Sequence, residues 1–301
     1  MDLLHPQLAA FAAVIEEGSF EHAARRLSVT PSAISQRIKA LEDRLGQVLV
    51  VRQTPCKPTA AGERLLLRLR PMQALEAEAL ADFLPEEVRP AQSRPVAIAV
   101  NDDSLHTWVI TALANLHAGH GFFFDVRVDD QDHTLDHLRE GAVLGAITSE
   151  RKALQGCNVF ALGRMRYHAI ASPAFVRKHF PRGMDAASLA AAPMIVFNRK
   201  DELQARYVRR VTRAKVTPPI HYLPTSTGFV EAAAKGLGWC LAPDLLARPA
   251  LAAGQIATID EERTLYVPLY WQCAAVPSST LQHITQALRS VAETALSPEP
   301  D

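Results

Sequence analysis

Residues 20–42 have the sequence FEHAARRLSVTPSAISQRIKALE, the pattern of two short helices joined by a tight turn. Ala23 and Ala24 give the first helix a small apolar face. Thr30 can cap the second helix through its hydroxyl, and Pro31 suits the first helical position, where no N–H donor is needed. The stretch therefore predicts a helix-turn-helix, a motif whose second helix lies in the major groove of DNA.

The second predicted helix has two chemically different faces. Ile34, Ile38 and Leu41 recur at spacings of four and three, which places them on one stripe suited to burial. The other face carries hydroxyls, an amide and a cation, the groups that bind base edges and phosphates. An ordinary helical hairpin with solvated faces is the alternative, but the turn length, the cap and the split of faces favour DNA binding. We expect DNA contacts in this segment at Thr30, Pro31, Ser32, Ser35, Gln36 and Lys39.

Charge supports this interpretation locally. The whole chain is neutral, with 32 basic and 32 acidic residues. Between His22 and Lys57, however, there are seven basic residues and only two acidic ones. A positive patch on a neutral chain is typical of a regulator that binds DNA through one small domain, and it argues against a histone-like coat protein.

The flanking residues complete a winged domain. Residues 1–17 carry apolar side chains at helical spacing and predict a supporting helix. The apolar run at 48–51 predicts a short strand, and the turn-rich segment after it predicts a wing. Arg52 and Lys57 are expected near the phosphate backbone. We assign residues 1–59 to a winged helix-turn-helix DNA-binding domain.

A long helix and a hinge are expected next. Pro71 predicts a kink or an interruption of the helix at 60–84, because proline lacks an N–H and clashes with the carbonyl four residues back. Residues 85–95 contain three prolines and predict a hinge. The apolar residues of the helix recur at threes and fours, the pattern of a coiled-coil seam and so of a dimer interface. They are Leu65, Leu69, Met72, Leu75, Ala79 and Phe83.

Residues 96–301 alternate between strand-like and helix-like segments. Strand patterns at 96–100, 122–128 and 143–147 are separated by helix patterns, which predicts right-handed crossovers and a mostly parallel sheet. The same alternation returns between 167 and 242. We expect two α/β lobes of the periplasmic-binding-protein type, lobe I at about 96–163 and 268–301 and lobe II at about 164–267. Two lobes joined by two crossings form a cleft that can close on a small molecule.

Residues 3–62 resemble the winged helix-turn-helix of the LysR-type transcriptional regulators, and the length and layout of the chain are similar to that family. The effector domain resembles the ArgP/LysG branch, which senses basic amino acids. In that branch a small residue stands where this chain has Asp102. The resemblance implies a tetramer and control of a basic-amino-acid exporter or a related metabolic gene. The matching stretches are 98–101, 103–105 with Trp108, 129–133, 145–148, 163–167 and 269–273.

The expected ligand site lies beyond the carboxyl ends of the strands. Helix starts rich in hydroxyls can bind a carboxylate, although simple capping is the alternative at each. A cationic side chain in a closed cleft needs a carboxylate partner, and aromatic rings can line the pocket or simply belong to the core. Asp201 is expected at the surface, and Asp102 in contact with ligand or in a solvated loop. The predicted effector contacts are Asn101, Asp103, Ser104, Trp108, Asp129, Asp130, Thr148, Glu150, Tyr167, Thr225, Ser226, Thr227 and Trp271.

Other chemistry is not indicated. The four cysteines have no paired spacing, and His133 and His137 have no evident third metal ligand. No phosphate loop or nucleophile elbow is present, and no apolar run could span a bilayer. We expect no metal, no cofactor and no enzymatic activity.

The sequence thus predicts a cytoplasmic transcription factor that responds to lysine or arginine. Its expected partners are double-stranded promoter DNA, further copies of the chain and RNA polymerase, with no membrane contact. One alternative is a sequence-tolerant, chromosome-organising DNA-binding protein without a small-molecule response. Another is an enzyme built on the α/β half, which would need an activated nucleophile or a metal cluster.

Overall fold

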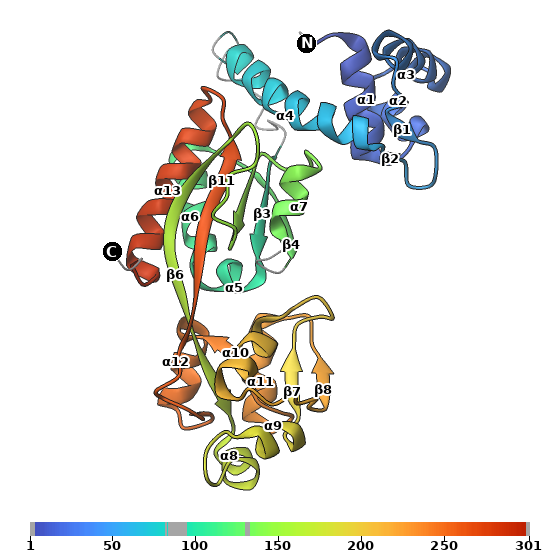
Figure 1. The fold of residues 1–301 in the computed structure, drawn as a ribbon. Coiled ribbons are helices and arrows are strands. Elements are labelled where there is room, and N and C mark those ends of the chain that lie inside the picture. Colours follow the sequence, from blue (N-terminus) through green and yellow to red (C-terminus); the bar gives the residue numbers. More distant parts are fainter. Residues whose placement is uncertain (1–3, 82, 84–94, 130–132, 299–301) are drawn as a thin grey trace.

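The computed structural model describes residues 4–81, 83, 95–129 and 133–298. Figure 1 shows a small N-terminal domain, one long helix, and two lobes placed one beyond the other along the molecule. Predicted residue Asp130 lies outside the described residues, as does the predicted hinge except for Pro95.

The N-terminal domain has the predicted helix-turn-helix. Its elements are α1 (Pro6–Glu17), α2 (Phe20–Arg26), α3 (Pro31–Leu45), β1 (Val50–Val51) and β2 (Lys57–Pro58). Thr30 caps α3, since its Oγ1 accepts from the N–H of Ala33 at 3.2 Å, and Pro31 is the first helical residue. The stripe of Ile34, Ile38 and Leu41 is buried, as expected from its spacing.

The wing is attached to the recognition helix by one side chain. Glu42 Oε1, on α3, accepts hydrogen bonds from the N–H groups of Leu49 (2.8 Å) and Val50 (3.3 Å). The strand is shorter than the apolar run at 48–51 suggests, because only Val50 and Val51 pair with β2. Val48 is 64% exposed and contributes nothing to the core.

Helix α4 (Ala60–Ala81) runs through Pro71 without interruption, so the kink remains as the expected effect of this proline. The helix ends before Phe83, which is 85% exposed, and is therefore shorter than the expected 60–84. Pro71 is buried, and Leu66 and Leu69 just before it pack into the core of the N-terminal domain. This burial offsets the hydrogen bond that proline cannot make.

Part of the expected coiled-coil seam packs against the N-terminal domain of the same chain. Leu69 is buried in the N-terminal core and Leu65 packs against it, so neither is fully available to a second copy. Met72, by contrast, is 46% exposed. Leu69 therefore belongs to the chain's own core, while a dimer interface along the rest of the seam stays a prediction.

The effector domain has one large mixed sheet. Its strands are β3 (Val96–Asn101), β4 (Phe124–Asp129), β5 (Gly145–Thr148), β6 (Cys157–Ala171), β9 (Cys240–Pro243), β10 (Ala257–Thr258) and β11 (Leu265–Ala274). Their order is β10-β6-β11-β5-β3-β4, and β9 also pairs with β6. The strands expected at 96–100, 122–128 and 143–147 do pair in parallel, in the order β4-β3-β5. The other pairs of this sheet are antiparallel, so the sheet as a whole is mixed rather than mostly parallel. The long strands β6 and β11 run between the lobes in opposite directions, which makes their pairing antiparallel.

Helices cover both lobes. Lobe I carries α5 (Asp102–Ser104), a π-helical turn (Leu105–Val109), α6 (Ile110–His120), α7 (Thr134–Arg139) and α13 (Ser279–Ala295). Lobe II contains α8 (Pro173–His179), α9 (Ala186–Ala191), β7 (Met194–Val196), α10 (Leu203–Val211), β8 (Ile220–Tyr222), α11 (Ser226–Ala234) and α12 (Asp244–Ala252). In Figure 1 the lobes are connected through β6 and β11.

Close packing in lobe I depends on one glycine. Trp271 on β11 is fully buried, and its Nε1 donates to Thr285 Oγ1 on α13 at 3.0 Å. The indole lies directly over Gly145 of β5, where an added Cβ would meet the ring at 2.2 Å. Any side chain at this position must displace a fully buried tryptophan.

We expect Gly145→Ala to destabilise the effector domain by about 1–3 kcal/mol, because overpacking forces the indole and α13 apart. Gly119→Ala is the matched control: Gly119 lies inside α6 with no atom within 4 Å of a new Cβ, so alanine there should be neutral or stabilise by up to about 1 kcal/mol. Urea unfolding followed by tryptophan fluorescence reports on this domain, since all three tryptophans lie in it. Equal stability of the two variants would contradict the packing argument.

Candidate DNA-reading helix and effector cleft

The polar face of α3 is exposed. Ser32, Gln36 and Lys39 are exposed and Ser35 is half-buried, while the opposite stripe forms the core. The first turn of α3 contains no acidic residue, so its positive N-terminal end is not neutralised by a carboxylate of that turn. Such a helix start suits a phosphate, and the exposed side chains after it suit base edges.

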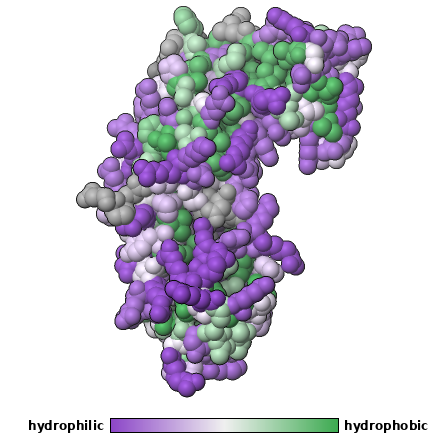
Figure 2. Space-filling model, in the orientation of Figure 1, coloured by the Kyte–Doolittle hydropathy of each residue, from purple (hydrophilic) through white to green (hydrophobic). Residues whose placement is uncertain are grey.

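The wing presents two further cations. Arg52 and Lys57 are exposed, and the Arg52 guanidinium lies 5.1 Å from the centre of the Phe20 ring. Arg26, by contrast, is paired with Glu16 (2.5 Å) and Glu17 (3.1 Å) inside the domain. Part of the local positive charge is therefore neutralised within the fold. On the face in Figure 2, hydrophilic side chains predominate along the outer edge of this domain.

A small polar pocket lies where the two lobes meet. Its volume is about 30 Å³. Lobe I contributes α5, and lobe II contributes the segment before α10, the first residues of α10, two residues of α11 and one residue of β9. The lining residues are Asp102, Asp103, Phe197, Asp201, Leu203, Gln204, Ser226, Phe229 and Leu241.

Asp103 is a half-buried acid of this pocket. The Tyr167 hydroxyl donates to its Oδ2 at 2.5 Å, and among the described residues no basic side chain pairs with it. Burial raises the pKa of Asp103 to about 6, although hydrogen bonding to Ser226 and Tyr167 favours the charged form. Burial and the adjacent Asp103 carboxylate raise the pKa of Tyr167 well above its usual value. The phenol therefore stays protonated and acts as the donor.

Several buried polar groups near the pocket lack partners. Ser104 Oγ and both amide atoms of Asn101 and of Gln204 make no hydrogen bond with the described residues. Each of these side chains is at most 1% exposed. Buried polar atoms are normally paired, so a cluster of unpaired ones marks a place suited to a polar ligand.

Comparison with known proteins supports one domain for binding DNA and a second domain for binding a small molecule. Residues 5–63 match the family model of the bacterial regulatory helix-turn-helix proteins of the lysR family, and residues 90–293 match the LysR substrate-binding domain. The chain belongs to the LysR family of transcriptional regulators. Proteins of this family are regulators rather than enzymes.

Named relatives refine the family branch. The chain is 45% identical in sequence to ArgP from Mycobacterium tuberculosis. The crystal structure of that protein matches this structure with a TM-score of 0.87, over 99% of this chain and 100% of that one. It is 39% identical to full-length LysG from Corynebacterium glutamicum with its effector Arg bound, with a TM-score of 0.78, covering 98% and 100%. The lysine export transcriptional regulatory protein LysG of C. glutamicum is 40% identical over 97% of this chain and 99% of its own length. The chain is thus a LysR-type regulator of the LysG/ArgP type.

Only part of the predicted effector set lines the pocket of this LysR-type regulator. Asp103 and Ser226 line it, and Tyr167 reaches it through Asp103. Asn101 and Ser104 are the residues on either side of Asp102 and Asp103. Thr225 caps α11, with its Oγ1 accepting from the N–H of Gly228 at 3.4 Å and lying 3.2 Å from Thr227 Oγ1.

The remaining predicted residues lie elsewhere in lobe I. Trp108 and Trp271 belong to its core rather than to the pocket. Asp129 and Thr148 end β4 and β5, and Asp129 lies 3.9 Å from His137. Glu150 is exposed in the turn after β5, where its carboxylate accepts from the N–H of Lys152.

Two acids differ from expectation. Asp201 was expected at the surface, but it lines the pocket, and its carboxylate accepts from the N–H groups of Phe197 (3.2 Å) and Leu203 (2.8 Å). Asp102 is neither in a solvated loop nor free for a ligand, because it bonds to lobe II. Phe197, Gln204 and Phe229 also line the pocket, although their sequence context does not predict it. Asp201 had a usable signal, since it follows a strand of lobe II as Asp103 follows one of lobe I.

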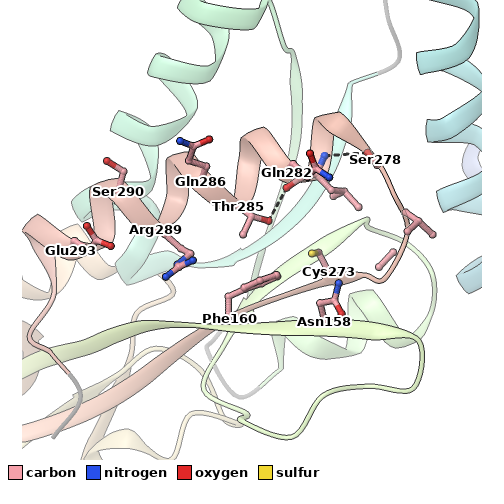
Figure 3. Close-up of a pocket in the computed structure, with 13 residues that line it drawn as sticks. Asn158, Phe160, Cys273, Ser278, Gln282, Thr285, Gln286, Arg289, Ser290 and Glu293 are labelled. Carbon is pink, nitrogen blue, oxygen red and sulfur yellow. Dashed lines mark hydrogen bonds between the residues drawn. The ribbon is translucent and has the colours of Figure 1, made fainter. Parts of the chain in front are cut away.

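A larger groove lies outside the cleft. Its volume is about 510 Å³, and it lies between α13 and the strands β6 and β11 (Figure 3). Figure 3 shows Phe160 and Cys273 on the strand side and Thr285 and Arg289 on the helix side. None of the predicted effector residues lines it.

Among the described residues no helix is both long and apolar enough to cross a bilayer. The same residues hold no group of three His, Cys, Asp or Glu that could bind a metal ion.

We expect Lys39→Ala to weaken binding to all DNA sequences and to reduce the slope of log K against log salt by about 0.9, the contribution of one phosphate contact. Lys235→Ala is the control, because Lys235 lies in lobe II and pairs with Glu231 at 2.6 Å. Binding is measured by fluorescence anisotropy between 50 and 200 mM salt, on the order of the range in which such slopes are resolved. An unchanged slope in Lys39→Ala would remove this side chain from the phosphate contacts.

Proposed function

We propose that this regulator controls a promoter in response to a basic amino acid, lysine or arginine, bound between its lobes. The observation that carries the proposal is the half-buried Asp103 carboxylate, which has no basic partner among the described residues. An ionised carboxylate in such a place is costly, and a cationic ligand would relieve that cost. Asp201, on the opposite lobe, adds a second negative charge to the same pocket.

The two helix starts supply the complementary chemistry for the carboxylate of an amino acid. The N–H groups at the start of α11 and the Ser104 hydroxyl at α5 are donors suited to an anion. We propose that the effector contacts these groups together with Asp103 and Tyr167. Supporting residues are Asn101, Ser226 and the Thr225–Thr227 hydroxyls.

Effector identity is also supported by the relatives. The C. glutamicum LysG structure holds arginine as effector, and the related protein of that organism is named for lysine export. We extend both to this chain as a proposal: its effector is lysine or arginine, and its target is a basic-amino-acid exporter or a related metabolic gene. Dimers that bind paired half-sites, a tetramer built from them, contact with RNA polymerase and a cytoplasmic location complete the proposal.

The signal has a contiguous route to the DNA-binding domain. Glu78 near the end of α4 accepts hydrogen bonds from Ser278 Oγ (2.5 Å), Ser279 N (3.1 Å) and Thr280 N (3.2 Å) at the start of α13. Because α13 packs on lobe I and α4 packs on the N-terminal domain, a change in the pose of lobe I moves α4. We propose that this alters the spacing of paired recognition helices.

Thermal unfolding against the twenty amino acids at millimolar concentration tests the proposal. A ligand that binds only the folded protein at 100 times its Kd stabilises it by about 2.7 kcal/mol, so we expect a selective rise in Tm with lysine or arginine. The alternative of a DNA-binding protein without small-molecule response predicts no shift with any amino acid. That outcome would refute the proposed effector class while leaving the DNA-binding domain unaffected.

The affinity for arginine should depend on pH through Asp103. Its pKa of about 6 in the effector-free protein falls when a cation binds, so below pH 6 binding must release a proton. Affinity therefore rises with pH and levels off above about 7, with about a tenfold loss between pH 7 and pH 5.

Isothermal titration calorimetry across this range measures the effect. Asp103→Asn removes the titrating group, so binding should be much weaker and nearly independent of pH. Asp136→Asn is the control, since that carboxylate pairs with Arg139 on the exposed side of α7. A pH dependence that persists in Asp103→Asn would assign it to another group, for example His106, whose Nδ1 lies 3.4 Å from Asp102.

A further inference from the structure

Asp102 makes a hydrogen bond between the two lobes at the pocket, in addition to the bond from Tyr167 of lobe II to Asp103 of lobe I. Asp102 Oδ2, at the start of α5 in lobe I, accepts from the backbone N–H of Ser226 in lobe II at 2.6 Å. The two residues are 124 positions apart in the chain. The Asp102 side chain is only 14% exposed, so the bond is largely shielded from water.

The donor of this hydrogen bond is an N–H group at the start of a helix. Ser226 is the first residue of α11, a nine-residue helix, and N–H groups of the first turn have no partner within the helix. The positive end of the helix favours an anion at this point. Asp102 thus occupies a position that is chemically suited to the carboxylate of an amino acid.

The pocket beside this bond is too small for its ligand. A volume of about 30 Å³ holds about one or two waters, whereas lysine and arginine are several times larger. Gln204 lines this space at 1% exposure, with both amide atoms unpaired among the described residues. The lobes are therefore closed over polar groups that have no partner, and an effector can enter only if the lobes separate.

We propose that Asp102 is a built-in competitor for the carboxylate of the effector, which holds the cleft closed until an effector displaces it from the start of α11. The inference rests on the proposed function and adds to it a residue that sets both the resting state and the selectivity of the site. Two carboxylates cannot share one N–H at hydrogen-bond distance without strong repulsion. Effector binding is therefore an exchange of one anion for another at Ser226.

The exchange has a consequence for selectivity. A ligand with a carboxylate must displace Asp102 to use the start of α11, so its carboxylate adds little net affinity in the natural protein. When Asp102 is absent, that carboxylate gains the free helix start. Arginine and its decarboxylated analogue agmatine differ in this group and therefore measure the effect directly.

The closing contact is tested without any ligand, by hydrogen exchange of the Ser226 amide in the full-length protein. Asp102→Ala should accelerate this exchange at least about tenfold, since a hydrogen bond to a charged group contributes roughly 1.5–3 kcal/mol. Asp102→Asn keeps an acceptor without the charge, so its exchange rate should lie between those of the natural protein and Asp102→Ala. Asp136→Ala, on the surface of α7, is the control and should leave Ser226 unchanged. Unaltered exchange in Asp102→Ala overturns the closing role.

The competition is tested by calorimetry with arginine and agmatine. The ratio of the arginine affinity to the agmatine affinity should rise about tenfold in Asp102→Ala, because only arginine gains the vacated hydrogen-bond donor. An unchanged or lower ratio overturns the competition and makes Asp102 a partner of the cationic group. If neither protein binds arginine, lysine or agmatine, the proposed effector class fails, and the exchange of Ser226 still decides whether Asp102 closes the cleft.

Discussion

The effector domain depends on the pairing of two strands, β6 and β11. They pair antiparallel from Tyr167 and Leu265 to Cys157 and Ala274, and this ladder carries both connections between the lobes. Because both crossings lie in one ladder, the lobes cannot slide apart without breaking it, but they can rotate as it twists. The register shifts between Leu269 and Tyr270, opposite Gly163. Gly163 has a φ of +123°, which a residue with a side chain rarely adopts, so this is the natural place for the ladder to bend.

The pocket lies between the two lobes that this ladder connects. The lobes contact each other there through Asp102 and Ser226, while Asn101, Ser104 and Gln204 are buried with side-chain atoms that have no partner among the described residues. These groups lower the stability of the closed, empty domain. A ligand that satisfies them recovers that free energy on binding, which is how a folded protein can store a preference for one small molecule.

The sequence predicts the local features of the fold better than it predicts the pairing of distant strands. The Thr30 cap and the stripe of Ile34, Ile38 and Leu41 depend on residues within one or two helical turns, and they were predicted with their roles. The parallel pairing of β3 with β4 and β5 was predicted, whereas the antiparallel pairing of β6 with β11 was not, because the order and length of strands do not indicate which distant strands become neighbours.

The pocket was predicted in part for the same reason. Asp103 and Glu150 both follow buried strands, yet only Asp103 lies where the second lobe covers it. Asp201 belongs to the pocket only because lobe II folds over lobe I. Trp271 is aromatic, as a pocket wall could be, but its contact with Gly145 places it in the core. Residue type and position after a strand are thus insufficient without the geometry of closure.

Helix α4 has a consequence for exchanging parts between regulators. The side chains of Leu66 and Leu69 belong to the core of the N-terminal domain, whereas the backbone at Leu66 and Leu67 lies against Gly141 of the effector domain. Further along the same helix, Glu78 is bonded to the start of α13. No single cut within this helix separates the two sets of contacts. A chimera that joins a foreign DNA-binding domain to this sensor must therefore carry the whole helix and match both surfaces on which it packs.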